Sequence, residues 1–255
     1  MPGQRAPPAH PAGERACTRR GGAPGTTPRN KAGNESGKDI PINACINISW
    51  TYFNLGDTTE ALIWCRKAIE KSKKLVSDPV GDLARAQNLL GSIYLDKHQP
   101  DSALPLFFQA LQGLKTLFGE HHPKIAMENS NIASCYILKN QTDSALYFIQ
   151  QAIISNLPGF DNTNIYVNPV KLNALDRDQL LGDVWKKANL LAKRGDSRKD
   201  MEASARTWLL ASALIDSIRL SFRSEKSRLF FTKEVHQIYD DAIASLFRFY
   251  SITSD

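Results

Sequence analysis

Residues 131–152 read NIASCYILKNQTDSALYFIQQA, and the spacing of their apolar and small residues occurs three times along the chain. The central tyrosines are spaced by 42 residues, at Tyr52, Tyr94 and Tyr136. Nine and sixteen residues after each tyrosine comes an alanine, and these two columns hold Ala61, Ala103, Ala145 and Ala68, Ala110, Ala152. Columns that stay in register over three copies predict a structural repeat.

The chemistry of the columns predicts helical hairpins. A small residue three positions before each tyrosine allows two helices to cross closely, and this column holds Ser49, Gly91 and Ala133. Polar breaks at residues 55–57, 98–100 and 140–142 separate the paired helices. One hairpin cannot bury its apolar face alone, so we expect the hairpins to stack. From Ile40 onward apolar residues recur at intervals of three and four with no period of two, which predicts an all-α fold.

Capping patterns predict where several helices begin. Asp57 with Glu60, and Ser197 with Asp200, have the spacing of a capping box. Asp39 before Pro41 and Asp78 before Pro79 pair a capping side chain with a first-turn proline.

The columns resemble the tetratricopeptide repeat, with its Leu-Gly/Ala-x-x-Tyr first helix and Ala-x-x-x-Phe-x-x-Ala second helix. The 42-residue period is similar to the long variety found in kinesin light chains and many bacterial proteins, and residues 119–123 (GEHHP) match its connecting loop. The tryptophan of the shorter consensus is replaced by Cys45, Gln87 and Asn129. The resemblance covers about residues 41–156 and implies a right-handed superhelix of antiparallel hairpins, with three hairpins over residues 40–156.

The positive charge of the chain is concentrated at its start. The 255 residues carry a net charge of +6, of which +5 falls in residues 1–38. That segment holds 13 of the 28 glycines and prolines and no Leu, Ile, Val, Phe, Tyr or Trp, so we expect residues 1–39 to be a disordered tail. It is either a flexible leader or a basic arm for nucleic acid or anionic lipid.

The register changes after residue 157. Amphipathic segments over about residues 169–194 and 197–222 predict an irregular fourth hairpin, with Gly195 ending its first helix. A final helix without a partner is predicted to end at Tyr250, so residues 157–250 form a second region and residues 251–255 a short tail.

Residues 214–226, with residues 239–242, resemble the segment that links tetratricopeptide repeats to a C-terminal CHAT domain, a caspase-like fold frequent in bacterial proteins. The resemblance implies a sensing or regulatory repeat region of a CHAT-type protein. The alternative is a fragment of a caspase-like CHAT peptidase whose catalytic histidine and cysteine lie beyond residue 255.

No residue constellation predicts catalysis, so we expect no enzyme activity from the chain itself and no cofactor or metal. His121 and His122 are adjacent in a connecting loop, and the cysteines at 45, 65 and 135 fall in apolar helical patterns typical of core thiols. The carboxylates of Asp240 and Asp241 diverge by about 100° on a helix. No secretory signal or membrane-spanning run is visible, so we expect a cytoplasmic location.

Surface recognition is the remaining chemistry. In the resembling family, positions two, five, nine, twelve and thirteen of each first helix line a concave groove. These positions correspond to Asn43, Ile46, Trp50, Phe53, Asn54, Arg85, Asn88, Ser92, Leu95, Asp96, Met127, Ser130, Ser134, Ile137 and Leu138. The expected partner is a protein or peptide, rather than a nucleic acid, a membrane or a small-molecule substrate. Trp50 and Phe53 either face the groove or pack against a neighbouring helix or the tail.

Overall fold

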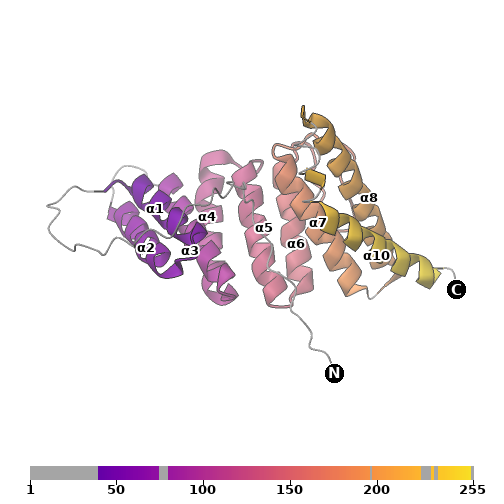
Figure 1. Ribbon diagram of the computed structural model, residues 1–255, viewed down its shortest axis with the longest axis horizontal. Coiled ribbons are helices and arrows are strands. Elements are labelled where there is room, and N and C mark those ends of the chain that lie inside the picture. Colours follow the sequence, from indigo (N-terminus) through magenta and orange to yellow (C-terminus); the bar gives the residue numbers. More distant parts are fainter. Residues whose placement is uncertain (1–39, 75–79, 196, 225–230, 233–234, 254–255) are drawn as a thin grey trace, which may run out of the picture. The chain divides into compact units, whose positions relative to one another are not determined.

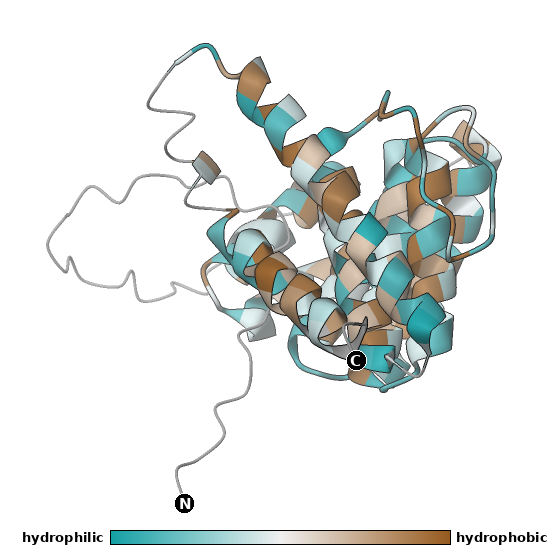
Figure 2. Cartoon of the chain, turned by 90° about the vertical axis from the view of Figure 1, so that its right-hand side faces the viewer, coloured by the Kyte–Doolittle hydropathy of each residue, from teal (hydrophilic) through white to brown (hydrophobic). Residues whose placement is uncertain are grey.

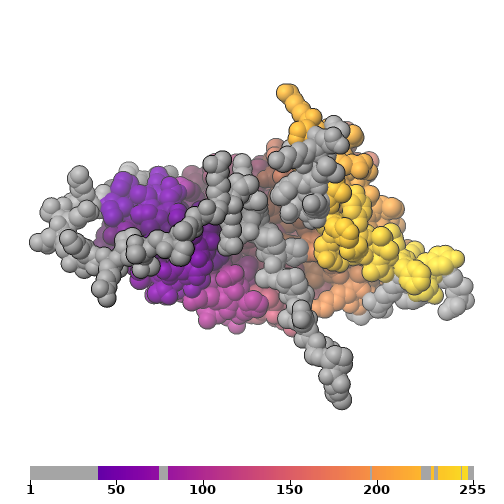
Figure 3. Space-filling view, in the orientation of Figure 1, coloured from indigo at the N-terminus to yellow at the C-terminus, as the bar shows by residue number. Residues whose placement is uncertain are grey.

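The computed structural model describes residues 40–74, 80–195, 197–224, 231–232 and 235–253. Within these ranges the chain forms nine helices and no strand. The helices follow one another in chain order (Figure 1), and the colours of the space-filling view run in the same order (Figure 3). They are α1 (Ile42–Asn54), α2 (Thr58–Lys74), α3 (Val80–Asp96), α4 (Pro100–Phe118), α5 (Pro123–Leu138), α6 (Thr142–Asn156), α7 (Arg177–Arg194), α8 (Arg198–Ser221) and α10 (His236–Thr253). The predicted all-α fold is confirmed.

Eight helices pair in sequence order into four hairpins, α1 with α2, α3 with α4, α5 with α6 and α7 with α8. Each hairpin packs on the next, because α2 contacts α3, α4 contacts α5 and α6 contacts α7. The backbones of the first helices of successive hairpins also approach one another closely, whereas in the part of the chain described the backbones of the second helices α2, α4 and α6 lie farther apart. The first helices therefore line the more crowded, inner face of the stack.

The turns inside the three repeated hairpins share one backbone geometry. Gly56, His98 and Asn140, again 42 residues apart, adopt left-handed conformations with φ of 82°, 56° and 55°. The next residue in each turn donates its backbone N–H to the carbonyl of the repeat tyrosine, as in Gln99 to Tyr94 at 2.9 Å. This bond satisfies a carbonyl that the end of the first helix leaves without a partner.

The repeat columns form the core. All six alanines of the two alanine columns are fully buried, and so is the apolar column between them, Cys65, Phe107 and Ile149. Gly91 shows why a small residue precedes the tyrosine, because a Cβ atom there would lie 2.8 Å from the ring of Phe107. The crossing of α3 and α4 therefore depends on the absence of a side chain at this position.

Cap geometry agrees with the sequence pattern at two helix starts. The backbone N–H of Glu60 donates to Asp57 Oδ1 at 3.1 Å, and that of Asp200 donates to Ser197 Oγ at 3.2 Å. The caps predicted at Asp39 and Asp78 lie outside the described residues, as does the tail predicted over residues 1–39.

The three described cysteines, Cys45, Cys65 and Cys135, are free and fully buried. Burial raises the pKa of Cys65 and of Cys135 to about 12, so both thiols stay protonated at neutral pH. They pack as small apolar groups.

The fourth hairpin differs from the sequence expectation at its start. α7 begins at Arg177 rather than near Pro169, because residues 157–176 form a non-helical connection between α6 and α7. Asn156 fixes the end of this connection, since its Nδ2 donates to the Asp176 carbonyl at 2.6 Å while its Oδ1 accepts from the Asp176 N–H at 2.8 Å.

Lys187 of α7 also binds the same connection. Its buried Nζ donates to Gln150 Oε1 at 2.7 Å, to the Val167 carbonyl at 2.9 Å and to Asn168 Oδ1 at 2.9 Å. Burial lowers the pKa of Lys187 to about 7. The connection is therefore tied to α6 and α7 by a lysine whose three contacts are all neutral oxygens.

The last helix, α10, packs against α8 and α7. Trp185 Nε1 of α7 donates to Asp241 Oδ2 of α10 at 2.9 Å. Hydrophobic residues lie along α10 near the C-terminal end of the chain (Figure 2), and Ile243, Phe247 and Tyr250 remain exposed. Among the helices that the structure describes, none combines the length and the apolar character that crossing a bilayer requires.

Candidate functional site

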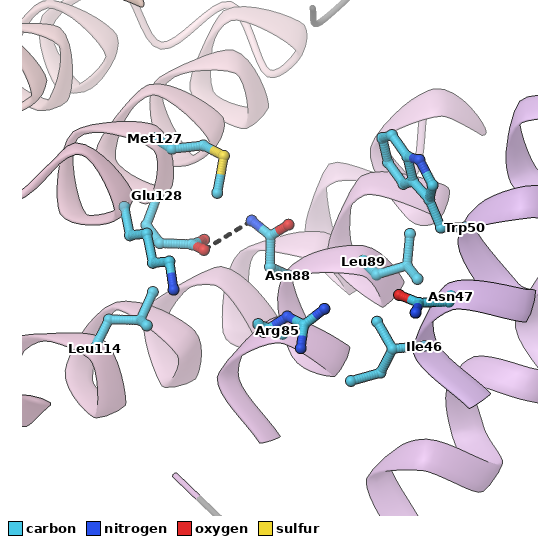
Figure 4. A pocket seen from close by; sticks show the side chains of 10 residues that line it. Ile46, Asn47, Trp50, Arg85, Asn88, Leu89, Leu114, Met127 and Glu128 are labelled. Carbon is cyan, nitrogen blue, oxygen red and sulfur yellow. Dashed lines mark hydrogen bonds between the residues drawn. The ribbon is translucent and has the colours of Figure 1, made fainter. Parts of the chain in front are cut away.

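A pocket of about 340 Å³ opens between the first helices α1, α3 and α5 (Figure 4). Five of the predicted groove residues contribute to its lining, namely Ile46, Trp50, Arg85, Asn88 and Met127. The remaining lining residues are Asn47, Leu89, Leu114, Lys124 and Glu128. We call this site the groove pocket.

The repeat explains why these side chains converge. Residues 42 apart occupy equivalent positions on neighbouring first helices, so Arg85 corresponds to Met127 and Ile46 corresponds to Asn88. Within α1, Ile46 and Trp50 are four residues apart and share one helix face. Trp50 is 48% exposed, with its ring centroid 6.0 Å from that of Phe53, so its indole faces the pocket instead of filling the core.

Arg85 is held in place by polar groups at the rim of the pocket. Its Nη1 donates to Asn43 Oδ1 on α1 at 2.6 Å and lies 3.4 Å from Asp82 Oδ1 on its own helix. The structure thus brings together two predicted groove residues from adjacent hairpins. The guanidinium remains exposed.

Glu128 is the unexpected member of the pocket. Its side chain is fully buried, and Oε1 accepts a hydrogen bond from Asn88 Nδ2 at 2.7 Å, while Oε2 has no partner among the described residues (Figure 4). Burial raises the pKa of Glu128 to about 8, and the Asn88 bond opposes this shift only in part. Burial therefore favours the neutral form of the carboxyl group, and the cationic side chains in the lining of the pocket are Arg85 and Lys124.

A departure from the repeat marks Glu128 in the sequence. The equivalent positions in the first two repeats hold alanine, Ala44 and Ala86. A carboxylate in a column of small residues is the signal that sequence reasoning missed. Lys124, Leu89 and Leu114 carry no comparable signal.

The groove positions of the third repeat are not all available to a ligand. Ser130 is buried, and its Oγ accepts from Lys186 Nζ of α7 at 2.7 Å, with Ser134 Oγ 3.3 Å from the same nitrogen. Burial lowers the pKa of Lys186, and the nearby Asp183 carboxylate opposes this shift. The fourth hairpin therefore uses these serines for its own packing.

The other predicted residues lie away from the lining of the groove pocket. Ser92 Oγ donates to the Asn88 carbonyl within α3 at 3.0 Å, and Leu95 and Ile137 pack on the core. The exposed members of this set are Asn54, Asp96 and Leu138. The pocket thus occupies one part of the predicted groove.

His121 and His122 lie in the connection between α4 and α5. His122 caps α5, because its Nδ1 accepts the backbone N–H of Lys124 at 3.1 Å, and its ring stacks on Phe118 at 4.2 Å. His121 Nε2 lies 3.2 Å from Asp161. Both are loop residues, as the sequence pattern indicated.

Comparison with known proteins supports the repeat assignment. The family model of the tetratricopeptide repeat matches residues 42–79 and, in a second version, residues 82–153. No curated protein matches the chain.

Solved structures show a similar fold. The chain is similar to a kinesin light chain-like protein of Podosopora anserina with nearly identical TPR-like repeats, at 15% identity and a TM-score of 0.56 over 84% of this chain and 94% of that one. A second crystal structure of these repeats gives 16% identity and a TM-score of 0.54, over 84% and 95%. BtubC (BKLC) from P. vanneervenii gives 15% identity and 0.56, over 72% and 66%. Residues 42–79 and 82–153 therefore match the tetratricopeptide repeat, and the described helices form a stack whose fold is similar to that of kinesin light chain-like repeat structures.

Proposed function

We propose that the chain is a non-enzymatic recognition module that binds a peptide segment of a partner protein in the groove pocket. Tetratricopeptide repeats generally serve as protein-interaction scaffolds, and this chain carries at least three hairpins of that kind. The observation that carries the proposal is the convergence of Trp50, Arg85, Asn88 and Met127 from three different helices on one pocket.

The lining indicates what such a segment contains. Ile46, Trp50 and Met127 offer an apolar surface for one large apolar side chain. Asn88 has its amide nitrogen bound to Glu128, so its amide oxygen, which points away from Glu128 in Figure 4, is left to accept an N–H from the ligand. Arg85 and Lys124 favour a segment without positive charge of its own.

The test is a selection followed by affinity measurements on variants. Peptides are selected from a phage-displayed library on the full chain, and their Kd values are measured by fluorescence anisotropy for the wild type, Trp50→Ala and Asn88→Ala. Tyr147→Ala is the matched control, because Tyr147 is 50% exposed on α6 and lies outside the pocket lining.

We expect Trp50→Ala to weaken binding by at least about tenfold, as removal of an aromatic anchor does. Asn88→Ala is expected to weaken binding less, by about three- to tenfold, because it removes one polar contact. Tyr147→Ala should bind as the wild type does. Wild-type affinity in both groove variants would refute the assignment of the groove pocket.

We also propose that the repeats form the sensing region of a CHAT-type protein. The support is the resemblance of residues 214–226 and 239–242, which fall at the end of α8 and in α10, with residues 225 and 226 outside the described part. The alternative, in which the chain is a piece of a caspase-like peptidase, predicts the same downstream domain. Reading the coding sequence past codon 255 for a histidine and a cysteine in an α/β pattern tests both versions.

A further inference from the structure

A second pocket lies on the other side of α3, between α2 and α4. Its volume is about 350 Å³, and its lining includes Arg66, Ile69, Lys73, Leu90, Leu106 and Gln109. Gln87 and Leu90 of α3 also face this pocket, and at about 100° per residue they project away from Arg85 and Asn88, which face the groove pocket. We call this second site the outer pocket.

The repeat provides an internal comparison that explains the outer pocket. Residues 42 positions after Arg66 and Leu106 are Phe108 and Phe148. These two rings pack edge to face on α4 and α6 with their centroids 5.6 Å apart, and Tyr136 stacks on Phe148 at 5.4 Å. An aromatic pair thus occupies, between α4 and α6, the positions that an arginine and a leucine hold between α2 and α4. Where the later repeat has two aromatic rings, the outer pocket has the side chains of Arg66 and Leu106, which fill less of the space between α2 and α4.

The polar groups of the outer pocket are held in fixed positions. Arg66 Nη2 donates to the Tyr94 hydroxyl at 3.2 Å, which leaves the other guanidinium N–H groups for a ligand. Gln87 Nε2 donates to Gln109 Oε1 at 2.7 Å, so Gln109 retains its own amide N–H₂ as a donor at the exposed edge. A planar guanidinium beside amide donors suits a carboxylate.

Charge complementarity points to the same kind of ligand. α2 carries five basic residues against Glu60 and Glu70, a net charge of +3. Glu70, the carboxylate in the pocket lining, accepts from Lys74 Nζ at 2.6 Å and is therefore neutralised by its own helix. The outer pocket thus presents cations, from Arg66 and Lys73, above an aliphatic floor.

We propose that the outer pocket is a second binding site, for a partner segment that carries an Asp or Glu next to a large aliphatic or aromatic side chain. The carboxylate pairs with Arg66, and the apolar side chain covers Leu90 and Leu106 in the space that Phe108 and Phe148 fill in the next repeat. No aromatic side chain lines the outer pocket in the described structure, so it lacks the stacking surface that single-stranded nucleic acid uses.

The test fills the outer pocket with two phenylalanines, the residues found at the equivalent positions of the next repeat. The double variant Arg66→Phe/Leu106→Phe copies Phe108 and Phe148 and is expected to fold, as checked by circular dichroism. Arg66→Lys keeps the charge but removes the planar fork. Trp50→Ala, which alters the groove pocket, separates this proposal from the proposed function.

The probes are fluorescein-labelled decapeptides in which one Leu, Ile or Phe is flanked by Asp and Glu residues. A matched set carries Asn and Gln in place of the acids, and a single-stranded RNA oligonucleotide serves as the competing anion. Binding to the full chain is followed by fluorescence anisotropy at low and high salt.

We expect at least one acidic probe to bind, its Kd to rise at least about tenfold in Arg66→Phe/Leu106→Phe and severalfold in Arg66→Lys, and Trp50→Ala to change it by less than about twofold. The amide probes should bind at least about tenfold more weakly. The proposal is overturned if no acidic probe binds, if filling the pocket leaves the Kd unchanged, if Trp50→Ala removes binding instead, or if only the RNA shows the Arg66 dependence.

Discussion

Gly91→Ala tests the packing rule of the repeat most sharply. In each repeat a small residue on the first helix faces an apolar residue on the second, and their sizes vary inversely. Gly91 faces the largest of these partners, Phe107, whereas the third repeat pairs Ala133 with Ile149. The rule predicts that Gly91 cannot enlarge unless Phe107 becomes smaller.

The magnitude follows from the geometry at this crossing. A Cβ atom on Gly91 would lie 2.8, 2.9 and 3.0 Å from three ring carbons of Phe107, and the ring is fully buried. Overpacking of this kind costs up to about 3 kcal/mol. Replacing glycine by alanine inside a helix contributes about 1 kcal/mol in the opposite direction. We therefore expect Gly91→Ala to lower the free energy of unfolding by about 2 kcal/mol.

The rescue experiment separates this account from a general intolerance of α3. In the background of Phe107→Ile, which copies the pair found in the third repeat, Gly91→Ala should stabilise the chain by about 1 kcal/mol. The coupling between the two positions is then about 3 kcal/mol. Urea unfolding followed by circular dichroism of the wild type, both single variants and the double variant measures it.

Because repeat arrays can unfold in parts, amide hydrogen exchange in α3 and α4 provides a second readout. A coupling near zero, with Gly91→Ala stabilising both backgrounds equally, would refute the packing rule.

Three further perturbations test other contacts. Acid is expected to weaken the start of α5, because only the unprotonated ring of His122 accepts the Lys124 N–H. Desolvation lowers the pKa of His122 below its ordinary 6.5, so this stabilisation is present above pH 6.5 and is lost as the pH falls. In thermal unfolding between about pH 5 and about pH 7.5, His122→Asn should remove this pH dependence. Burial lowers the pKa of Lys187 from 10.5 to about 7, so between these pH values the unfolded chain binds one more proton and the stability of the fold rises with pH. Lys187→Met should flatten this rise and lower the free energy of unfolding by about 1–3 kcal/mol at neutral pH, measured from the urea midpoints of the two proteins. Asp200→Asn should destabilise the fourth hairpin by about 3 kcal/mol in urea unfolding, because Asp200 is 2% exposed and pairs with Arg194 through both oxygens; wild-type stability would contradict it.

The features that recur every 42 residues were predictable from the sequence, because a repeated column has a repeated structural cause. The tyrosine, alanine and small-residue columns predict the three hairpins and their core, and the breaks at Gly56, His98 and Asn140 predict the turns. Five of the groove residues transferred from the family pattern do line one pocket.

The contacts made by features that occur once could not be worked out from the sequence alone. Glu128 is charged in sequence but buried in the structure, and only the neighbouring hairpin supplies its partner, Asn88. Lys186 reaches Ser130 from 56 residues away, which no local pattern reveals. The last part of residues 157–176 has an amphipathic pattern, which predicted a helix. Asn156 and Lys187 instead bind the backbone of this segment, and α7 begins only at Arg177.

A bound peptide is expected to lie on the inner face, against the first helices of three successive hairpins. Hydrogen–deuterium exchange of the full chain, with and without a saturating selected peptide, measures this directly. Protection of α1, α3 and α5 with little change in α6 and α8 is the predicted result. Protection confined to α2 and α4, or to α8 and α10, with the exchange of α1, α3 and α5 unchanged, would contradict it.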